Sequence, residues 1–176
     1  MAGLRRSSRR ALAGLCFALL PSAACAEMAW WLTERFTPAQ TSYEGLAARD
    51  LHPAWERFSV LNEAMLPAQA KPDLAWMKKE GLSFTREGDF NRNGRRDRAV
   101  VGVYVDTAGR LGRFLLVLEQ NGGRWRKAFL STDPGEPGFS VLSGRNEVYW
   151  SPCMECDIGS RLKPRANTYV LAPAGR

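Results

Sequence analysis

The chain has 176 residues, and its 25 Lys and Arg outnumber its 18 Asp and Glu to give a formal net charge of +7. Four of the basic residues but none of the acidic ones lie within the first 26 residues, a segment that we expect to be removed. The remaining 21 basic and 18 acidic residues give a net charge of +3, which removes the charge-based case for a nucleic-acid-binding protein.

Residues 1–26 have the three parts of a bacterial export signal. The basic start contains Arg5, Arg6, Arg9 and Arg10, Ala11–Leu20 is apolar, and Pro21 ends the apolar run. Ala24-Cys25-Ala26 then supplies small residues for cleavage before Glu27. The apolar run is shorter than the about 20 residues that a membrane-spanning helix needs, and no later segment qualifies. We therefore predict an exported protein, periplasmic or secreted, with no membrane span.

Two other forms of export signal stay open. Ser8-Arg9-Arg10-Ala11-Leu12 resembles a twin-arginine signal, and a general secretory signal would look much the same. Ser22-Ala23-Ala24-Cys25 is a degenerate lipobox, which makes Cys25 a candidate lipid anchor and the protein a candidate lipoprotein.

Residues 27–176 are predicted to form one domain whose first part, 27–80, is helical. Thr37-Pro38 and His52-Pro53 each place proline where a helix commonly begins. Apolar residues then recur at helical spacing as far as Pro67, at Trp55, Phe58, Leu61, Met65 and Leu66. A shorter helix is predicted from Pro72 to Lys79, with Gly81 as its left-handed cap.

Residues 82–172 are predicted to be rich in β-structure. The nearly continuous apolar runs Ala99–Val105 and Phe114–Leu118 indicate central strands that are buried on both faces. Asn121-Gly122-Gly123 is a strong hairpin signal. Further strands are expected at Trp125–Leu130, Phe139–Leu142, Glu147–Trp150 and Thr168–Leu171. The predicted fold class is therefore α+β, with N-terminal helices packed on an antiparallel β-meander.

The segment Gly88–Asp97 has the residue spacing of a cation-binding loop. Side-chain oxygens fall at its positions one, three, five and nine, which are Asp89, Asn91, Asn93 and Asp97, and glycine occupies position six. Arg95 would add its backbone carbonyl, and Gly94 permits the sharp turn. Hard oxygen ligands of this kind suit calcium. The loop is not an EF-hand, because Val100 stands where a bidentate glutamate is required.

These residues, together with the strand that follows them, resemble a single FG-GAP/VCBS-type calcium-loop repeat. The resemblance covers about 18 of the 176 residues, and it implies a ligand role for Asp89, Asn91, Asn93 and Asp97 and a carbonyl role for Arg95. One copy cannot close a β-propeller, because each blade buries its faces on its neighbours. With two carboxylates only, the expected calcium affinity is weak, with a Kd of about 10⁻⁴ to 10⁻³ M. The alternative is a loop of consecutive Asx turns in which arginines replace the charge of the ion.

Cys153 and Cys156 form the one CxxC motif of the mature chain. In an oxidising compartment such a pair is most simply a disulfide. Glu155 and Asp157 would raise the pKa of the thiols, which favours a structural bond over thiol–disulfide exchange. Zinc would need two more ligands, and His52 is the only histidine.

The sequence leaves three hypotheses for function. The first is a non-catalytic exported binding or interaction domain whose partner is a protein or glycan of the cell envelope. The second is an enzyme, either a periplasmic thiol–disulfide oxidoreductase or a hydrolase that uses a metal at Asp89 and Asp97. The third is an accessory or inhibitor subunit of an envelope complex, for which the loop arginines would contact an anionic partner: Arg92, Arg95, Arg96 and Arg98.

Overall fold

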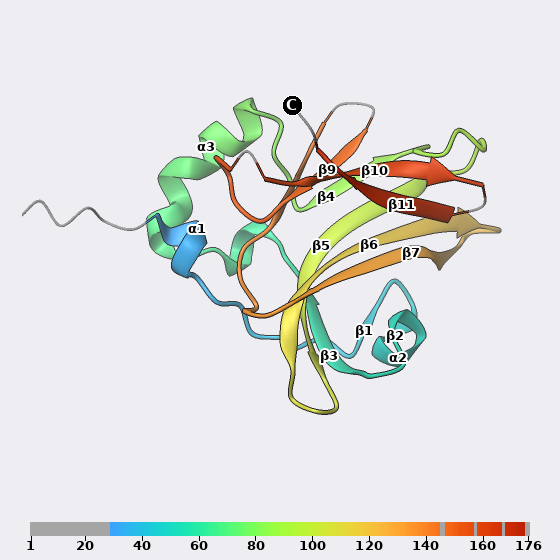
Figure 1. Cartoon of the computed structure of the whole chain (residues 1–176), viewed down its shortest axis with the longest axis horizontal. Coiled ribbons are helices and arrows are strands. Elements are labelled where there is room, and N and C mark those ends of the chain that lie inside the picture. The colour runs from blue at the N-terminus through green and yellow to red at the C-terminus, as the bar shows by residue number, and fades with distance from the viewer. Residues whose placement is uncertain (1–28, 145–146, 157, 167, 175–176) are drawn as a thin grey trace, which may run out of the picture.

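Antiparallel β-structure dominates the chain, in a computed structural model that describes residues 29–144, 147–156, 158–166 and 168–174. The strands are β1 Ser42–Tyr43, β2 Leu46–Ala47, β3 Trp55–Val60, β4 Thr85–Gly88, β5 Asp97–Asp106, β6 Leu111–Asn121, β7 Arg124–Pro134, β8 Val141–Ser143, β9 Val148–Ser151, β10 Ser160–Arg165 and β11 Thr168–Pro173. The helices are α1 Trp30–Thr33, α2 Ala48–Leu51 and α3 Lys71–Lys79, with short 3₁₀ turns at Glu63–Met65 and Ala68–Ala70. Figure 1 labels these elements. The predicted export signal and the candidate lipid anchor at Cys25 lie outside the described residues.

The predicted α+β class, with N-terminal helices packed on a meander, is wrong. Strands hold 49% of the residues and helices 16%, and α3 is the only described helix of seven or more residues. The part predicted to be helical, 27–80, contains the strands β1, β2 and β3 besides α3 and short helical segments. The segment after Thr37-Pro38 is extended, and Gln40 pairs with Phe58 of β3.

The error at β3 has a definite cause. Trp55 and Phe58 lie three residues apart, which is the spacing of one helix face, yet both are buried side chains of a strand. A β-bulge between Trp55 and Arg57 adds one residue, Glu56, to the strand, and this places Trp55 and Phe58 on the same face of the sheet. A bulged strand therefore imitates helical periodicity.

The predicted helix at Pro72–Lys79 is confirmed as α3, and so is its glycine cap. Gly81 has a φ of +67°, and its N–H donates to the carbonyl of Lys78 at 3.1 Å. The N–H of Leu82 donates to the carbonyl of Met77 at 2.7 Å, which completes the Schellman arrangement of hydrogen bonds.

The central sheet is built on β5 and β6, which are buried on both faces as their apolar sequences predicted. Its strand order is β3-β5-β6-β7. Strands β4 and β3 share one edge of β5, where β4 pairs with the first part of β5 and β3 pairs with the last part. The predicted Asn121-Gly122-Gly123 hairpin is confirmed, since it connects β6 to β7. Helix α2 packs on one face of the sheet beside the β1–β2 hairpin.

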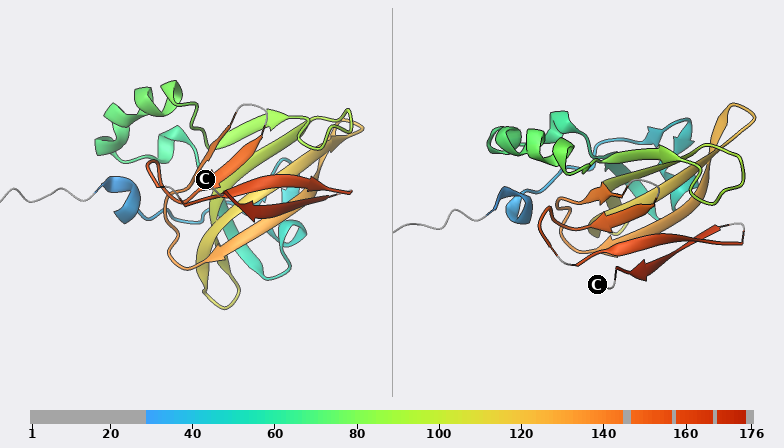
Figure 2. Two further views of the ribbon diagram at one scale, coloured as in Figure 1. Left: turned by 45° about the horizontal axis from the view of Figure 1, so that its top comes forward. Right: turned by 90° about the horizontal axis from the view of Figure 1, so that it is seen from above.

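A second sheet covers the other face, with strand order β11-β10-β9-β8. Figure 2 shows the two sheets as layers, with α1 and α3 at one end. At one side, Ser83 and Leu142 form a bridge between the sheets. At the other side, the Thr168 hydroxyl donates to the carbonyl of Ala128 in β7 at 3.1 Å. The core between the two sheets contains buried residues from many parts of the chain, the first of which is Trp30 and the last Tyr169.

Candidate metal site

The Asp89 loop connects β4 to β5 and folds around the carboxylate of its first residue. One oxygen of Asp89 accepts the N–H of Asn93 at 2.9 Å, and the other accepts the N–H of Gly94 at 2.8 Å. Gly94 has a φ of +79°, a conformation that glycine adopts without steric cost. The side chain of Asp89 therefore spans the inside of the loop.

The two asparagines continue this pattern. The Asn91 side-chain oxygen accepts the N–H of Asn93 at 3.2 Å, and the Asn93 side-chain oxygen accepts the N–H of Arg95 at 2.8 Å. An oxygen that accepts one hydrogen bond keeps a second lone pair. The side-chain oxygens of Asn91 and Asn93 therefore point back at the loop backbone, and each keeps a lone pair with which it could bind a cation.

Asp97 closes the loop from inside the protein. Its side chain has no solvent exposure, and one carboxylate oxygen accepts the N–H of Phe90 at 2.8 Å and the hydroxyl of Tyr169 at 2.7 Å. The other oxygen, Oδ1, is buried and has no hydrogen-bond partner among the described residues. Burial raises the pKa of Asp97, and the negative charges of Glu119 and Asp89 raise it further. A buried carboxylate in this state lacks a compensating positive charge.

The structure adds two residues to the site that the sequence analysis missed. Glu119 lies opposite Asp97 in the β5–β6 pairing, is nearly fully buried, and accepts a hydrogen bond from the Asn93 side-chain amide. The strand register could have identified Glu119. Tyr169, 72 residues beyond Asp97, has no local signal in the sequence.

Ion pairs hold Glu119 in its charged form. Its carboxylate pairs with Arg126 of β7 and, at 3.0 Å, with Arg95. The hydrogen bond from Arg126 is the largest cause that lowers the pKa of Glu119 to about 2, with Asn93 and Arg95 contributing in the same direction.

The arginines of the loop neutralise carboxylates other than those of the predicted metal site. Arg95 pairs with Glu119 as described, and Arg96 and Arg98 both pair with Glu87 of β4. Arg98 also pairs with Glu44. Within the described residues, no ion pair reaches Asp89 or Asp97. The consecutive Asx turns of the alternative are present, because Asn91 and Asn93 each accept the N–H of the residue two positions later. Its arginines, however, do not pair with Asp89 or Asp97 among the described residues.

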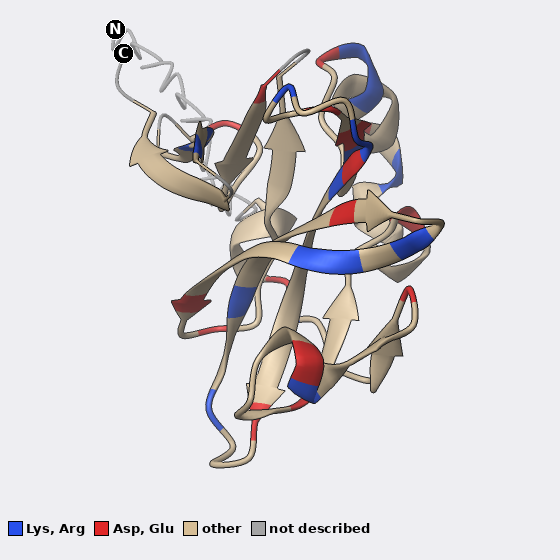
Figure 3. Ribbon diagram, turned by 90° about the vertical axis from the view of Figure 1, so that its right-hand side faces the viewer, with Lys and Arg blue, Asp and Glu red and all other residues tan. Residues whose placement is uncertain are grey.

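The same ion pairs reduce the number of arginines that are free to bind the predicted anionic partner. Of its four arginines, Arg92 alone makes no ion pair within the part of the chain that the structure describes. Figure 3 shows basic and acidic segments interspersed over this end of the molecule.

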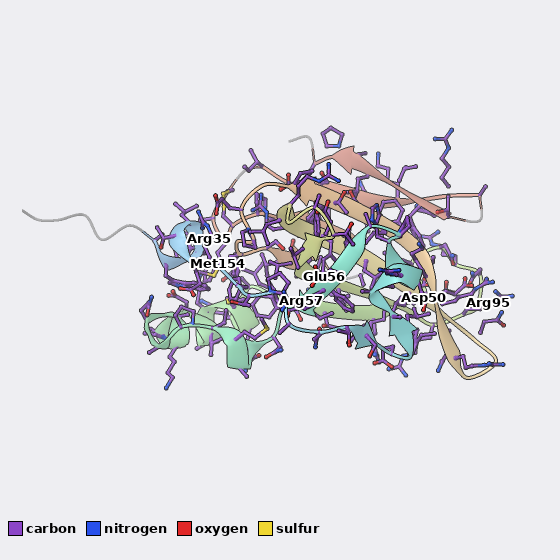
Figure 4. All side chains as sticks on the ribbon, turned by 90° about the horizontal axis from the view of Figure 1, so that it is seen from below. Arg35, Asp50, Glu56, Arg57, Arg95 and Met154 are labelled. Atoms are coloured by element: carbon purple, nitrogen blue, oxygen red, sulfur yellow. A yellow bond between two sulfur atoms is a disulfide. The ribbon has the colours of Figure 1, made fainter. Side chains whose placement is uncertain are left out.

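The cysteine pair lies at the other end of the molecule. Cys153 and Cys156 are at disulfide distance, with their Cα atoms 5.6 Å apart, which confirms the predicted pairing. Cys153 is 2% exposed, and the described residues between β9 and β10 contain no helix that would lower a thiol pKa. Figure 4 places Met154, which lies between the two cysteines, at the opposite end from Arg95.

The donors of the loop suit a hard cation. Among the described residues there is no group of three or more His, Cys, Asp and Glu side chains that could hold a metal. The loop instead offers two carboxylates and two amide oxygens, at Asp89, Asp97, Asn91 and Asn93. Sets made entirely of oxygen are typical of calcium rather than zinc or copper.

The comparisons with known proteins add no relative. No protein-family model, curated protein or solved structure matches this chain. The resemblance of the loop to FG-GAP/VCBS repeats therefore stays a prediction. Within the described residues, no helix has both the length and the apolar character needed to cross a bilayer.

Proposed function

We propose that the chain is an exported, non-catalytic binding domain in which the Asp89 loop holds a calcium ion and the cysteine pair is a structural disulfide. The main support for the calcium site is the Asp97 carboxylate, which is fully buried and has one oxygen without a hydrogen-bond partner among the described residues. Isolated buried carboxylates are costly, and a bound cation removes that cost.

Each predicted ligand has a defined place in this proposal. Asp89 and Asp97 supply the negative charge, and Asn91 and Asn93 supply neutral oxygens. Arg95 supplies its backbone carbonyl, to which no backbone N–H among the described residues donates a hydrogen bond. The bound ion would neutralise Asp89 and Asp97, because the loop arginines pair with other carboxylates. With two carboxylates, the expected Kd is about 10⁻⁴ to 10⁻³ M.

A binding domain has more support than an accessory subunit that uses the arginine cluster. Three of the four arginines of that cluster already pair with carboxylates of this chain, so a partner would have to displace those pairs. We expect the partner to be a protein or a glycan of the cell envelope.

Calorimetric titration of the chelator-treated protein with calcium tests the proposal. We expect binding of one ion and a rise in the melting temperature, since a ligand at ten times its Kd stabilises the folded state by about 1.4 kcal/mol. Asp89→Asn removes one of the two ligand charges and is expected to weaken calcium binding by about tenfold, or about 1.4 kcal/mol. The matched control is Glu155→Gln, which removes an exposed carboxylate at the disulfide end. It should change neither the calcium affinity nor the melting temperature.

The absence of both heat and a melting-temperature change at millimolar calcium would reject the ion. If Asp89→Asn bound calcium as tightly as the unmodified protein, the ion would bind outside the Asp89 loop.

A further inference from the structure

A groove of about 520 Å³ runs beside the Asp89 loop. One wall comes from the end of β4 and the loop, and the other comes from β9 and β10. The loop side of the groove presents Glu87, Asp89, Phe90 and Arg92, and the other side presents Glu147, Arg161 and Lys163. It therefore lies between the two sheets, at the end where the candidate metal site lies.

The groove contains two cations that pair with no carboxylate among the described residues. Arg92 and Lys163 both line it, and neither forms an ion pair with a described carboxylate. Arg161 pairs with Glu147, so these two charges offset each other. The Asp89 carboxylate receives two backbone N–H groups and, under the proposed function, a calcium ion. Glu87 also lines the groove, and it pairs with Arg96 and Arg98, which do not line it. Among the described residues that line the groove, Arg92 and Lys163 therefore face Asp89 as the one carboxylate without an ion pair.

The backbone at Arg92 adopts a conformation that is uncommon for its residue type. Its φ is +59°, in the left-handed region that favours glycine and asparagine over arginine. Conformations of this kind are enriched at functional sites, and in this chain Glu44 and Ala166 adopt the same one outside the groove. The side chain of Arg92 is exposed at the groove, which is where a ligand would meet it.

We propose that this groove binds an acidic carbohydrate of the uronic-acid type, an inference that rests on the proposed function as an exported binding domain. Arg92 and Lys163 would each bind a sugar carboxylate. The carboxylates of Glu87 and Glu147 would accept hydrogen bonds from sugar hydroxyls. The half-buried ring of Phe90 would contact the apolar face of a sugar ring.

The mixture of cations and carboxylates selects this ligand over an acidic peptide. A uronic-acid chain presents a carboxylate and several hydroxyl donors on each ring, so both kinds of lining residue find a partner. A polyglutamate chain presents carboxylates without side-chain hydroxyls, so it offers Glu87 and Glu147 no hydroxyl donor.

The test is calorimetric titration of the protein with trigalacturonic acid, carried out first in chelator, because uronates themselves bind calcium, and then in calcium. We expect binding in both buffers and none with neutral galactotriose. Arg92→Gly combined with Lys163→Ala should lower the affinity for the acidic sugar by at least about tenfold. The matched control is Arg49→Ala combined with Lys79→Ala, which removes two exposed cations outside the groove and should leave the affinity unchanged.

Folding can be separated from binding in this experiment. Because glycine suits the φ of Arg92, we expect Arg92→Gly alone to keep or raise the melting temperature while it weakens sugar binding.

Failure of the acidic sugar to bind in either buffer would overturn the groove proposal, as would equal binding by the double variant or tighter binding of polyglutamate. Sugar binding by a protein whose calcium titration is silent would reject the ion and support the groove.

Discussion

At the scale of single residues, Asp97 links the loop, the central sheet and the second sheet. It begins β5, accepts the N–H of Phe90 from the loop, and accepts the hydroxyl of Tyr169 from β11. Its pKa is raised, whereas that of Glu119 on the neighbouring strand is lowered, although both side chains are buried. The difference arises because arginines surround Glu119 and none pairs with Asp97 among the described residues.

Glu119 gives a prediction for acid stability. Its pKa falls from 4.5 to about 2 on folding, so its charged form stabilises the protein above about pH 4.5. That contribution is lost as the pH falls from about 4.5 towards 2. Glu119→Gln cannot titrate, and we expect its free energy of unfolding to depend less steeply on pH over this window. Urea unfolding at a series of pH values measures the difference.

Glu80→Gln, an exposed carboxylate at the end of α3, is the control for this comparison and should keep the slope of the unmodified protein. Parallel pH profiles for Glu119→Gln and the unmodified protein would show that the arginines do not hold the Glu119 pKa low.

At the scale of elements, close contact between strands explains a glycine in the middle of β5. A Cβ atom at Gly102 would lie 2.3 Å from the Ser59 carbonyl oxygen of β3 and 2.4 Å from the Phe114 ring of β6. Neither the sheet backbone nor a fully buried ring can move away cheaply.

Gly102→Ala is therefore expected to destabilise the protein by about 1–3 kcal/mol, the usual cost of overpacking a core. Urea unfolding gives the value. Gly138→Ala is the matched control, since its nearest neighbour would lie at 3.7 Å and its φ is not positive. A Gly102→Ala protein as stable as the control variant would contradict the close packing of β3 and β6 against this position.

Local signals predicted the elements whose interactions are themselves local. The cap of α3 depends on Gly81 alone, and the β6–β7 hairpin depends on Gly122 and Gly123, so a short stretch of sequence suffices for each. The β3 strand depends on its pairing with β5, more than 40 residues later, and on a bulge that only this pairing reveals. Its sequence in isolation therefore predicted a helix.

At the scale of the whole molecule, the candidate site brings together segments that are far apart in the chain. The loop spacing predicted the residues from Asp89 to Asp97, because one short segment supplies them all. Glu119 and Arg126 enter the site through the register of β5, β6 and β7 in the central sheet, which the loop spacing alone does not reveal. Tyr169 could not be predicted, since its place depends on how the two sheets pack. The groove has the same origin, because its walls belong to different sheets.

The hydrogen bond between Asp97 and Tyr169 connects the loop to the second sheet, so an ion at the loop would stabilise contact between the layers. The most direct test of the account is an NMR titration in which calcium is added to isotope-labelled, chelator-treated protein. We predict that saturable shifts appear first at the backbone amides of Asn93, Gly94 and Arg95 and at Tyr169. Amide shifts that are absent at millimolar calcium, or that occur only away from the loop, would contradict it.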